Sequence, residues 1–150
     1  LPDEPMGNWD GGIIFEGTKG KILAVDIQPE MLAIVNERSR INRVKNVETV
    51  LGKTDDACLK PDSVDFILLV DVYHEFDKPF EMTASMVKSL KKGGRVVFVE
   101  YRKEDRRVPI KEVHKMSQAQ LRKEMALFPV KWVETNQTLP WQHIVVFEKL

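Results

Sequence analysis

The sequence predicts an α/β fold, in which a mostly parallel sheet carries helices on both faces and ends in an antiparallel hairpin. Short runs of apolar, β-prone residues alternate along the chain with segments of helical periodicity. Several of these runs are almost continuously apolar, as expected of strands buried on both faces of a parallel sheet. The last two runs lie close enough along the chain to pair antiparallel. Because 150 residues are near the size of one domain, we expect residues 1–150 to form a single domain.

The first clear β/α unit begins at residues 21–27 (KILAVDI), which predict a buried strand. Residues 29–38 predict the helix after it, since they open with a proline and an acid, and both suit the first turn of a helix. Val47–Leu51 then predicts a second strand, which ends at Gly52.

The middle of the chain repeats this pattern. Val64–Val70 (VDFILLV) predicts a third buried strand, and Pro79 predicts the start of the next helix. We expect Gly93 to end that helix, because glycine readily adopts the left-handed conformation that closes a helix. Residues 95–100 (RVVFVE) predict a fourth buried strand.

The last part of the chain predicts a short helix followed by a hairpin. Ser117 and Gln120 form a capping-box pattern for a helix that ends before Pro129. Residues 130–135 and 143–148 predict two strands joined by a turn.

Composition excludes several classes of protein. The chain has 23 basic and 23 acidic residues, so its charge favours no nucleic-acid partner. Its apolar runs are far shorter than the roughly 20 residues of a membrane span, and its first ten residues lack the pattern of a signal peptide. We therefore expect a cytoplasmic protein without a membrane partner. The single cysteine, Cys58, excludes an internal disulfide.

Three motifs carry a resemblance to a known family: residues 21–31 (KILAVDIQPEM), residues 66–76 (FILLVDVYHEF) and residues 90–100 (LKKGGRVVFVE). Together with the hairpin ending, they resemble the class I S-adenosylmethionine-dependent methyltransferases, which have a Rossmann-like fold. The resemblance covers about residues 19–149. It implies S-adenosyl-L-methionine as cofactor and a small-molecule or macromolecular methyl acceptor, which the sequence does not identify.

The resemblance also implies cofactor-binding residues. Asp26 ends the strand that grips the cofactor ribose in this family, and Ile27 adjoins it. A carboxylate at the carboxyl end of a strand can accept hydrogen bonds from both ribose hydroxyls. Thr54 and Asp55 follow the second strand, where the family places its adenine contacts. Asp71 follows the third strand and is our candidate contact for the methionine portion.

His74 is the candidate catalytic residue, because an imidazole with a pKa near 6.5 can accept a proton at neutral pH. A structural histidine under the loop is the alternative. Glu75 and Tyr101 lie on the same predicted rim and are candidate substrate contacts. His114 and His143 have no second ligand at metal spacing, so we expect structural roles for them and no metal site.

A basic cluster lies on the connection after the fourth strand, and it could attract an anionic substrate. Acidic residues interleave with it, however, so a solvated loop is the favoured interpretation. The cluster comprises Arg102, Lys103, Arg106 and Arg107.

The family's glycine-rich first unit has no clear counterpart here. Only 20 residues precede Lys21, whereas a strand, turn and helix need about 30. We therefore expect residues 1–20 to form an irregular or truncated first β/α unit. A methyltransferase-like binding or scaffold domain without catalytic activity is the alternative function. A nicotinamide-dependent oxidoreductase is less favoured, because such proteins usually lack the terminal hairpin.

Overall fold

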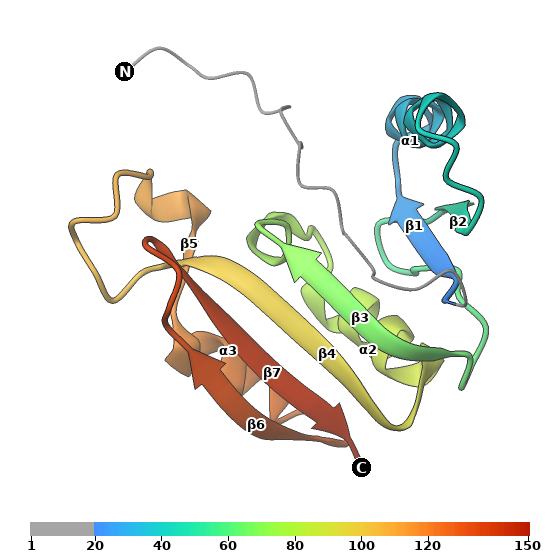
Figure 1. The fold of residues 1–150 in the computed structure, drawn as a ribbon. Coiled ribbons are helices and arrows are strands. Elements are labelled where there is room, and N and C mark those ends of the chain that lie inside the picture. Colours follow the sequence, from blue (N-terminus) through green and yellow to red (C-terminus); the bar gives the residue numbers. More distant parts are fainter. Residues whose placement is uncertain (1–19) are drawn as a thin grey trace.

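The computed structural model describes residues 20–150 and confirms the α/β class (Figure 1). The predicted first unit, residues 1–20, lies outside the described residues except for Gly20. The elements, in chain order, are β1 (Ile22–Asp26), α1 (Pro29–Ile41), β2 (Val47–Leu51), β3 (Val64–Val70), α2 (Pro79–Ser89), β4 (Leu90–Arg102), β5 (Lys115–Met116), α3 (Gln118–Met125), β6 (Val130–Asn136) and β7 (Gln142–Lys149). Two short 3-10 helices, Tyr73–Glu75 and Glu112–His114, complete the list. Within this part of the chain, no helix has the length and apolarity needed to cross a membrane.

The strands form two sheets. The larger has the order β3-β4-β7-β6, with β5 paired to the end of β4. Strand β3 runs parallel to β4, whereas β7 runs antiparallel to both β4 and β6, so β7 is the one reversed strand and the predicted hairpin is confirmed. Strands β1 and β2 pair parallel with each other as a separate sheet. A single sheet was expected, but among residues 20–150 no strand pairs with both β1 and β3.

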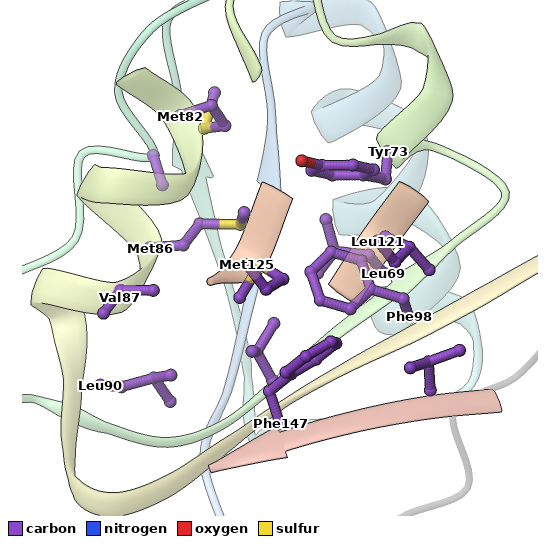
Figure 2. Close-up of a cluster of buried hydrophobic side chains, with 13 residues drawn as sticks. Leu69, Tyr73, Met82, Met86, Val87, Leu90, Phe98, Leu121, Met125 and Phe147 are labelled. Atoms are coloured by element: carbon purple, nitrogen blue, oxygen red, sulfur yellow. The ribbon is translucent and has the colours of Figure 1, made fainter. Parts of the chain in front are cut away.

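The main core lies on one face of the larger sheet (Figure 2). Phe98, at the centre of β4, is fully buried and meets Tyr73 and Phe147 edge-on, with ring centroids 5.0 and 5.9 Å apart. Helices α2 and α3 both contribute side chains to this cluster, so they cover the same face: Met82, Met86, Val87, Leu121 and Met125. The opposite face carries a smaller apolar cluster that contains no residue of a described helix. Helix α1 packs against β1 and β2 instead.

The helix ends depart from the predictions in instructive ways. Helix α2 ends at Ser89, whose hydroxyl donates to the Met86 carbonyl at 2.7 Å, rather than at Gly93. Gly93 does adopt a left-handed φ of 77°, but it does so within β4, where the pairing with β3 shifts register between Val64–Leu90 and Phe66–Arg95. The next residue must also be a glycine, because a Cβ at Gly94 would lie 2.8 Å from the Lys91 carbonyl oxygen. The two glycines therefore lie at this irregularity in β4 and do not cap the helix.

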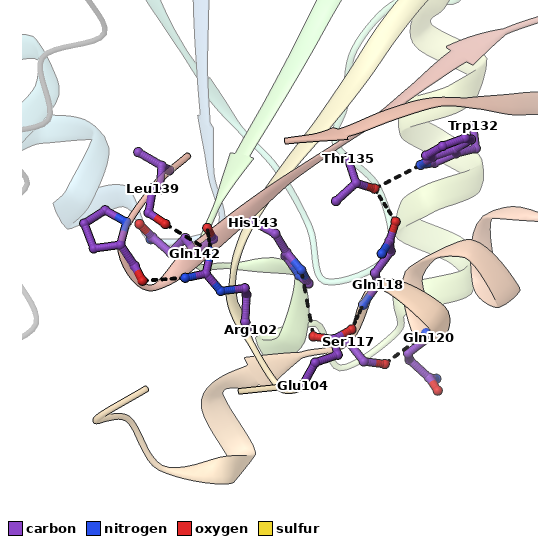
Figure 3. A network of polar contacts seen from close by, with 11 residues as sticks. Arg102, Glu104, Ser117, Gln118, Gln120, Trp132, Thr135, Leu139, Gln142 and His143 are labelled. Atoms are coloured by element: carbon purple, nitrogen blue, oxygen red, sulfur yellow. Dashed lines mark hydrogen bonds and ion pairs between the residues drawn. The ribbon is translucent and has the colours of Figure 1, made fainter. Parts of the chain in front are cut away.

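The capping-box prediction for α3 is confirmed in half. The Ser117 hydroxyl accepts a hydrogen bond from the Gln120 backbone N–H at 3.0 Å, as predicted (Figure 3). The Gln120 side chain, however, donates to Glu124 one turn on instead of returning to the cap. An N-cap hydroxyl alone satisfies one of the free N–H groups at a helix start.

Candidate functional site

Parallel pairing places the carboxyl ends of neighbouring strands side by side, and the predicted site residues fall there in two groups. Asp26 pairs with Leu51 at the ends of β1 and β2. Val70 pairs with Val99 near the ends of β3 and β4. The first group is Asp26, Ile27, Thr54 and Asp55; the second is Asp71, His74, Glu75 and Tyr101.

Asp26 is half-buried and shapes the turn between β1 and α1. Its Oδ1 accepts a hydrogen bond from the Gln28 backbone N–H at 2.8 Å. Its backbone carbonyl accepts from the Gly52 N–H at 2.9 Å, which holds the loop after β2 against the end of β1. Within residues 20–150, Oδ2 makes no described hydrogen bond, so this oxygen is available to a ligand. Ile27 beside it is exposed.

The loop after β2 links the two groups. Asp55 Oδ2 lies 3.3 Å from Lys78 Nζ, just before α2. Asp56 Oδ1 accepts from the Ser85 hydroxyl at 2.6 Å, on α2 itself. Thr54 is exposed immediately before these anchors. These contacts tie the loop of the first group to the helix that follows the second group.

Asp71 sits in a strained and partly desolvated position. Its φ of 50° is left-handed, which is uncommon for a residue other than glycine, although aspartate tolerates it better than most. Oδ2 accepts from the Gln142 side-chain amide at 2.6 Å, whereas Oδ1 is buried with no hydrogen-bond partner among the described residues. Burial raises the pKa of Asp71, and the Gln142 bond and the charge of His74 oppose that rise.

His74 rests on a fully buried carboxylate. Glu100 Oε2 lies 2.7 Å from His74 Nδ1, and Oε1 accepts from the Tyr73 backbone N–H at 2.9 Å. Burial raises the pKa of Glu100, and its hydrogen bond and charge interaction with His74 act in the opposite sense. When Glu100 is ionised it accepts the proton on Nδ1, and the lone pair of neutral His74 then lies on Nε2.

The Nε2 atom of His74 faces two further polar side chains. His114 Nδ1 lies 3.4 Å away and Glu75 Oε1 lies 3.8 Å away. His114 was expected to be structural, and no local pattern places it beside a residue 40 positions earlier. Glu100 was not singled out either, although it occupies the same place at the end of a buried strand that drew attention to Asp26.

Tyr101 pairs with Gln142 across the sheet, which brings it close to Asp71. Burial raises the pKa of Tyr101, and the negative charge of Asp71 adds to the rise. The strand pairing of Tyr101 with Gln142 and the Gln142–Asp71 hydrogen bond therefore bring Tyr101 near Asp71.

Two residues of the basic cluster, Arg102 and Arg107, make contacts within the protein. Arg102 donates to the backbone carbonyls of Leu139, Pro140 and Gln142, and so holds the turn between β6 and β7 (Figure 3). Arg107 pairs with Asp105 at 3.0 Å.

Two hollows on the described surface have volumes of about 440 and 350 Å³. Arg102 and Arg107 line the first; Lys92 and Lys131 are among the residues that line the second. No predicted site residue lines either hollow.

The sequence profile of a family described as "Methyltransferase domain" matches residues 11–98, more than half of the chain. The chain belongs to this methyltransferase domain family. No curated protein matches it in sequence.

Solved structures share the fold of this methyltransferase domain. A SAM-dependent methyltransferase from Aquifex aeolicus has a TM-score of 0.82 at 21% identity, over 89% of this chain and 71% of that one. An O-methyltransferase family 2 protein from Planctomyces limnophilus, in complex with apigenin, has a TM-score of 0.65 at 20% identity, over 87% and 44%. The (4+2)-cyclase SpnF has a TM-score of 0.73 at 10% identity, over 87% and 66%. A cyclase among them illustrates that one fold hosts different reactions.

The family match covers some of the predicted site residues and not their partners. Asp26, Asp71 and His74 lie within residues 11–98, whereas Glu100 and His114 lie beyond them. The groups that hold His74 therefore come from the part of the chain that the family profile does not cover.

Proposed function

We propose that this methyltransferase domain binds S-adenosylmethionine and transfers its methyl group to a nucleophilic acceptor at the rim that carries His74. The observation that carries the proposal is the buried Oδ1 of Asp71 at the carboxyl end of a parallel strand, which has no hydrogen-bond partner among residues 20–150. An orphaned buried acceptor costs about 1 to 3 kcal/mol, and a ligand that donates to it removes this cost. The α-ammonium group of the cofactor is such a donor.

The remaining predicted residues fit other parts of the same molecule. Asp26 has one carboxylate oxygen committed to the Gln28 N–H and the other available to ribose hydroxyls. Ile27 offers exposed apolar surface to the adenine. The loop with Thr54 and Asp55 is held at the end of β1 by the Gly52 N–H bond to the Asp26 carbonyl, and it supplies polar contacts to the same base.

The cofactor supplies a methyl group already activated as a sulfonium. The chain must then align the acceptor, and effective alignment accounts for up to roughly 7 to 11 kcal/mol of a barrier. Glu75 and Tyr101 are the candidate residues for holding the acceptor.

His74 is the proposed proton acceptor when the nucleophile carries a proton. Glu100 holds the proton on Nδ1 and stabilises the imidazolium that forms when Nε2 is protonated. The side chain of His74 is only 6% exposed, and its Nε2 lies 3.4 Å from His114 Nδ1. The proton therefore reaches His74 from the acceptor either through His114 or after His114 moves aside.

Calorimetric titration with S-adenosylmethionine tests the cofactor assignment. Asp26→Asn keeps an oxygen for the Gln28 N–H but removes the charge, and loss of a charged hydrogen bond of about 1.5 to 3 kcal/mol weakens binding by roughly 10- to 150-fold. Asp65→Asn is the matched control, because Asp65 is an exposed strand residue near the opposite end of β3.

The outcomes separate the two candidate functions. Binding by the wild type and by Asp65→Asn, with a loss in Asp26→Asn, supports the methyltransferase. A folded wild-type protein that binds neither S-adenosylmethionine nor its demethylated product contradicts it, and favours the binding or scaffold domain.

A further inference from the structure

We propose that His74, Glu75 and His114 form a binding site for a divalent transition-metal ion, with Zn²⁺ as the simplest occupant. Their ligand atoms all lie within 4.8 Å of one another. Two imidazoles and one carboxylate are a common ligand set for zinc and for related first-row ions. Three protein ligands leave a fourth position open to water or to another molecule.

The spacing of the ligand atoms fits a tetrahedral site. With metal–ligand distances near 2.0–2.1 Å, ligand atoms around a four-coordinate zinc lie roughly 3.3–3.4 Å apart. His74 Nε2 and His114 Nδ1 are 3.4 Å apart, and Glu75 Oε1 is 3.8 Å from His74 Nε2. The two imidazole planes are inclined by 72°, so the rings are not stacked. Only the exposed Glu75 side chain has to shift to close the site.

Glu100 supplies an independent second observation. Ligating histidines usually donate their other ring N–H to a carboxylate, which fixes the ring and makes the ligating nitrogen more basic. Glu100 does this for His74 from a fully buried position, and its other oxygen is held by the Tyr73 backbone N–H. A divalent cation at Nε2 also compensates the buried negative charge of Glu100, which neutral His74 alone leaves unbalanced.

The metal site does not depend on methyl transfer, although it shares an atom with the proposed mechanism. A metal ion and a proton compete for the one lone pair on His74 Nε2. The metal-free protein is therefore the form in which His74 can accept a proton from a substrate, and the two proposals are tested on different forms of the protein.

The test is titration of the untagged, chelator-treated protein with Zn²⁺ by calorimetry, and with Co²⁺ by visible absorption. The expected result is one equivalent bound, with the intense visible bands of four-coordinate cobalt. His114→Gln and Glu75→Gln each remove a ligand, and we expect at least about tenfold weaker binding. Glu100→Gln leaves all three ligands in place and is expected to weaken binding by roughly 10- to 100-fold.

Glu112→Gln is the matched control. It changes an exposed carboxylate in the same 3-10 helix as His114, outside the ligand group, and keeps an oxygen for Lys115. The affinity of Glu112→Gln for Zn²⁺ is expected to stay within about twofold of that of the wild type. Absence of stoichiometric binding overturns the proposal, as does equal binding by wild type, His114→Gln and Glu75→Gln. Circular dichroism confirms that each variant is folded, so loss of binding is attributable to the ligand.

Discussion

The two sheets differ sharply in how well they are buried, although each presents part of the same rim. On the larger sheet, β4 is flanked by β3 and β7, and α2 and α3 cover one face with fully buried side chains. In the β1–α1–β2 unit, Leu32 is the one buried large apolar side chain, while Val25, Ile27, Met31 and Leu51 are exposed. The residues around His74 therefore rest on a rigid base, and Asp26 rests on a unit with few buried contacts. Units of that kind open locally at low free-energy cost.

A matched pair of leucine truncations tests this difference most directly. Leu121→Ala removes a fully buried side chain from the main core and is expected to lower the free energy of unfolding by about 2 to 5 kcal/mol. Leu32→Ala makes the same chemical change in α1 and is expected to cost less than half as much. Urea denaturation measures both. Equal losses would show that α1 is as firmly integrated as α3.

The buried carboxylate provides a second comparison. Glu100→Gln leaves one oxygen for two N–H donors, from Tyr73 and His74, so the expected loss of stability is about 1 to 3 kcal/mol. Asp26→Asn, on the less buried unit, keeps its turn and is expected to change stability by less than about 0.5 kcal/mol. Thermal melts of the two variants at pH 7 provide the measurement. A larger loss of stability in Asp26→Asn than in Glu100→Gln would contradict the conclusion that the larger sheet is the more rigid of the two.

Asp71→Asn separates stability from binding on the larger sheet. The pKa of Asp71 is raised by burial, so the folded protein holds its proton to a higher pH than the unfolded chain, whose value is near 3.9. Stability is therefore lost as pH rises from that value through the folded pKa. Asparagine removes this loss and tolerates the left-handed φ.

We expect Asp71→Asn to raise the free energy of unfolding at pH 7 by up to about 1 kcal/mol while it weakens S-adenosylmethionine binding. Denaturation of the wild type and the variant from pH 4 to pH 8 measures how the free energy of unfolding of each depends on pH. A variant less stable than the wild type at pH 7 contradicts the account of Asp71.

The helix caps predict the smallest effects. Ser117 caps α3 through the Gln120 N–H, whereas Gln28 gives α1 no side-chain cap. Ser117→Ala should cost about 1 kcal/mol, and Gln28→Ser should add about 0.5 to 1 kcal/mol. Amide hydrogen exchange checks the second effect locally, because greater protection is expected in α1 alone. Increased protection throughout the chain would indicate that α1 and the larger sheet unfold together.

The sequence by itself determined the elements and their chemical class. The apolar runs of Val47–Leu51 and Val64–Val70 coincide with β2 and β3, and Pro29 and Pro79 begin α1 and α2 as predicted. These features depend on residues close together in the chain, since backbone periodicity and capping are local properties. The same reasoning marked Asp26, Asp71 and His74 as residues at strand ends.

Only the tertiary structure decided what those residues contact. The separation of β1–β2 from the larger sheet, the position of Glu100 behind His74 and the approach of His114 all join residues far apart in the sequence. The partner of Asp71, Gln142, lies 71 positions away. Such contacts depend on strand order and packing, and local periodicity predicts neither of them. The chemistry available to His74 therefore follows from the fold, although the histidine itself was visible in the sequence.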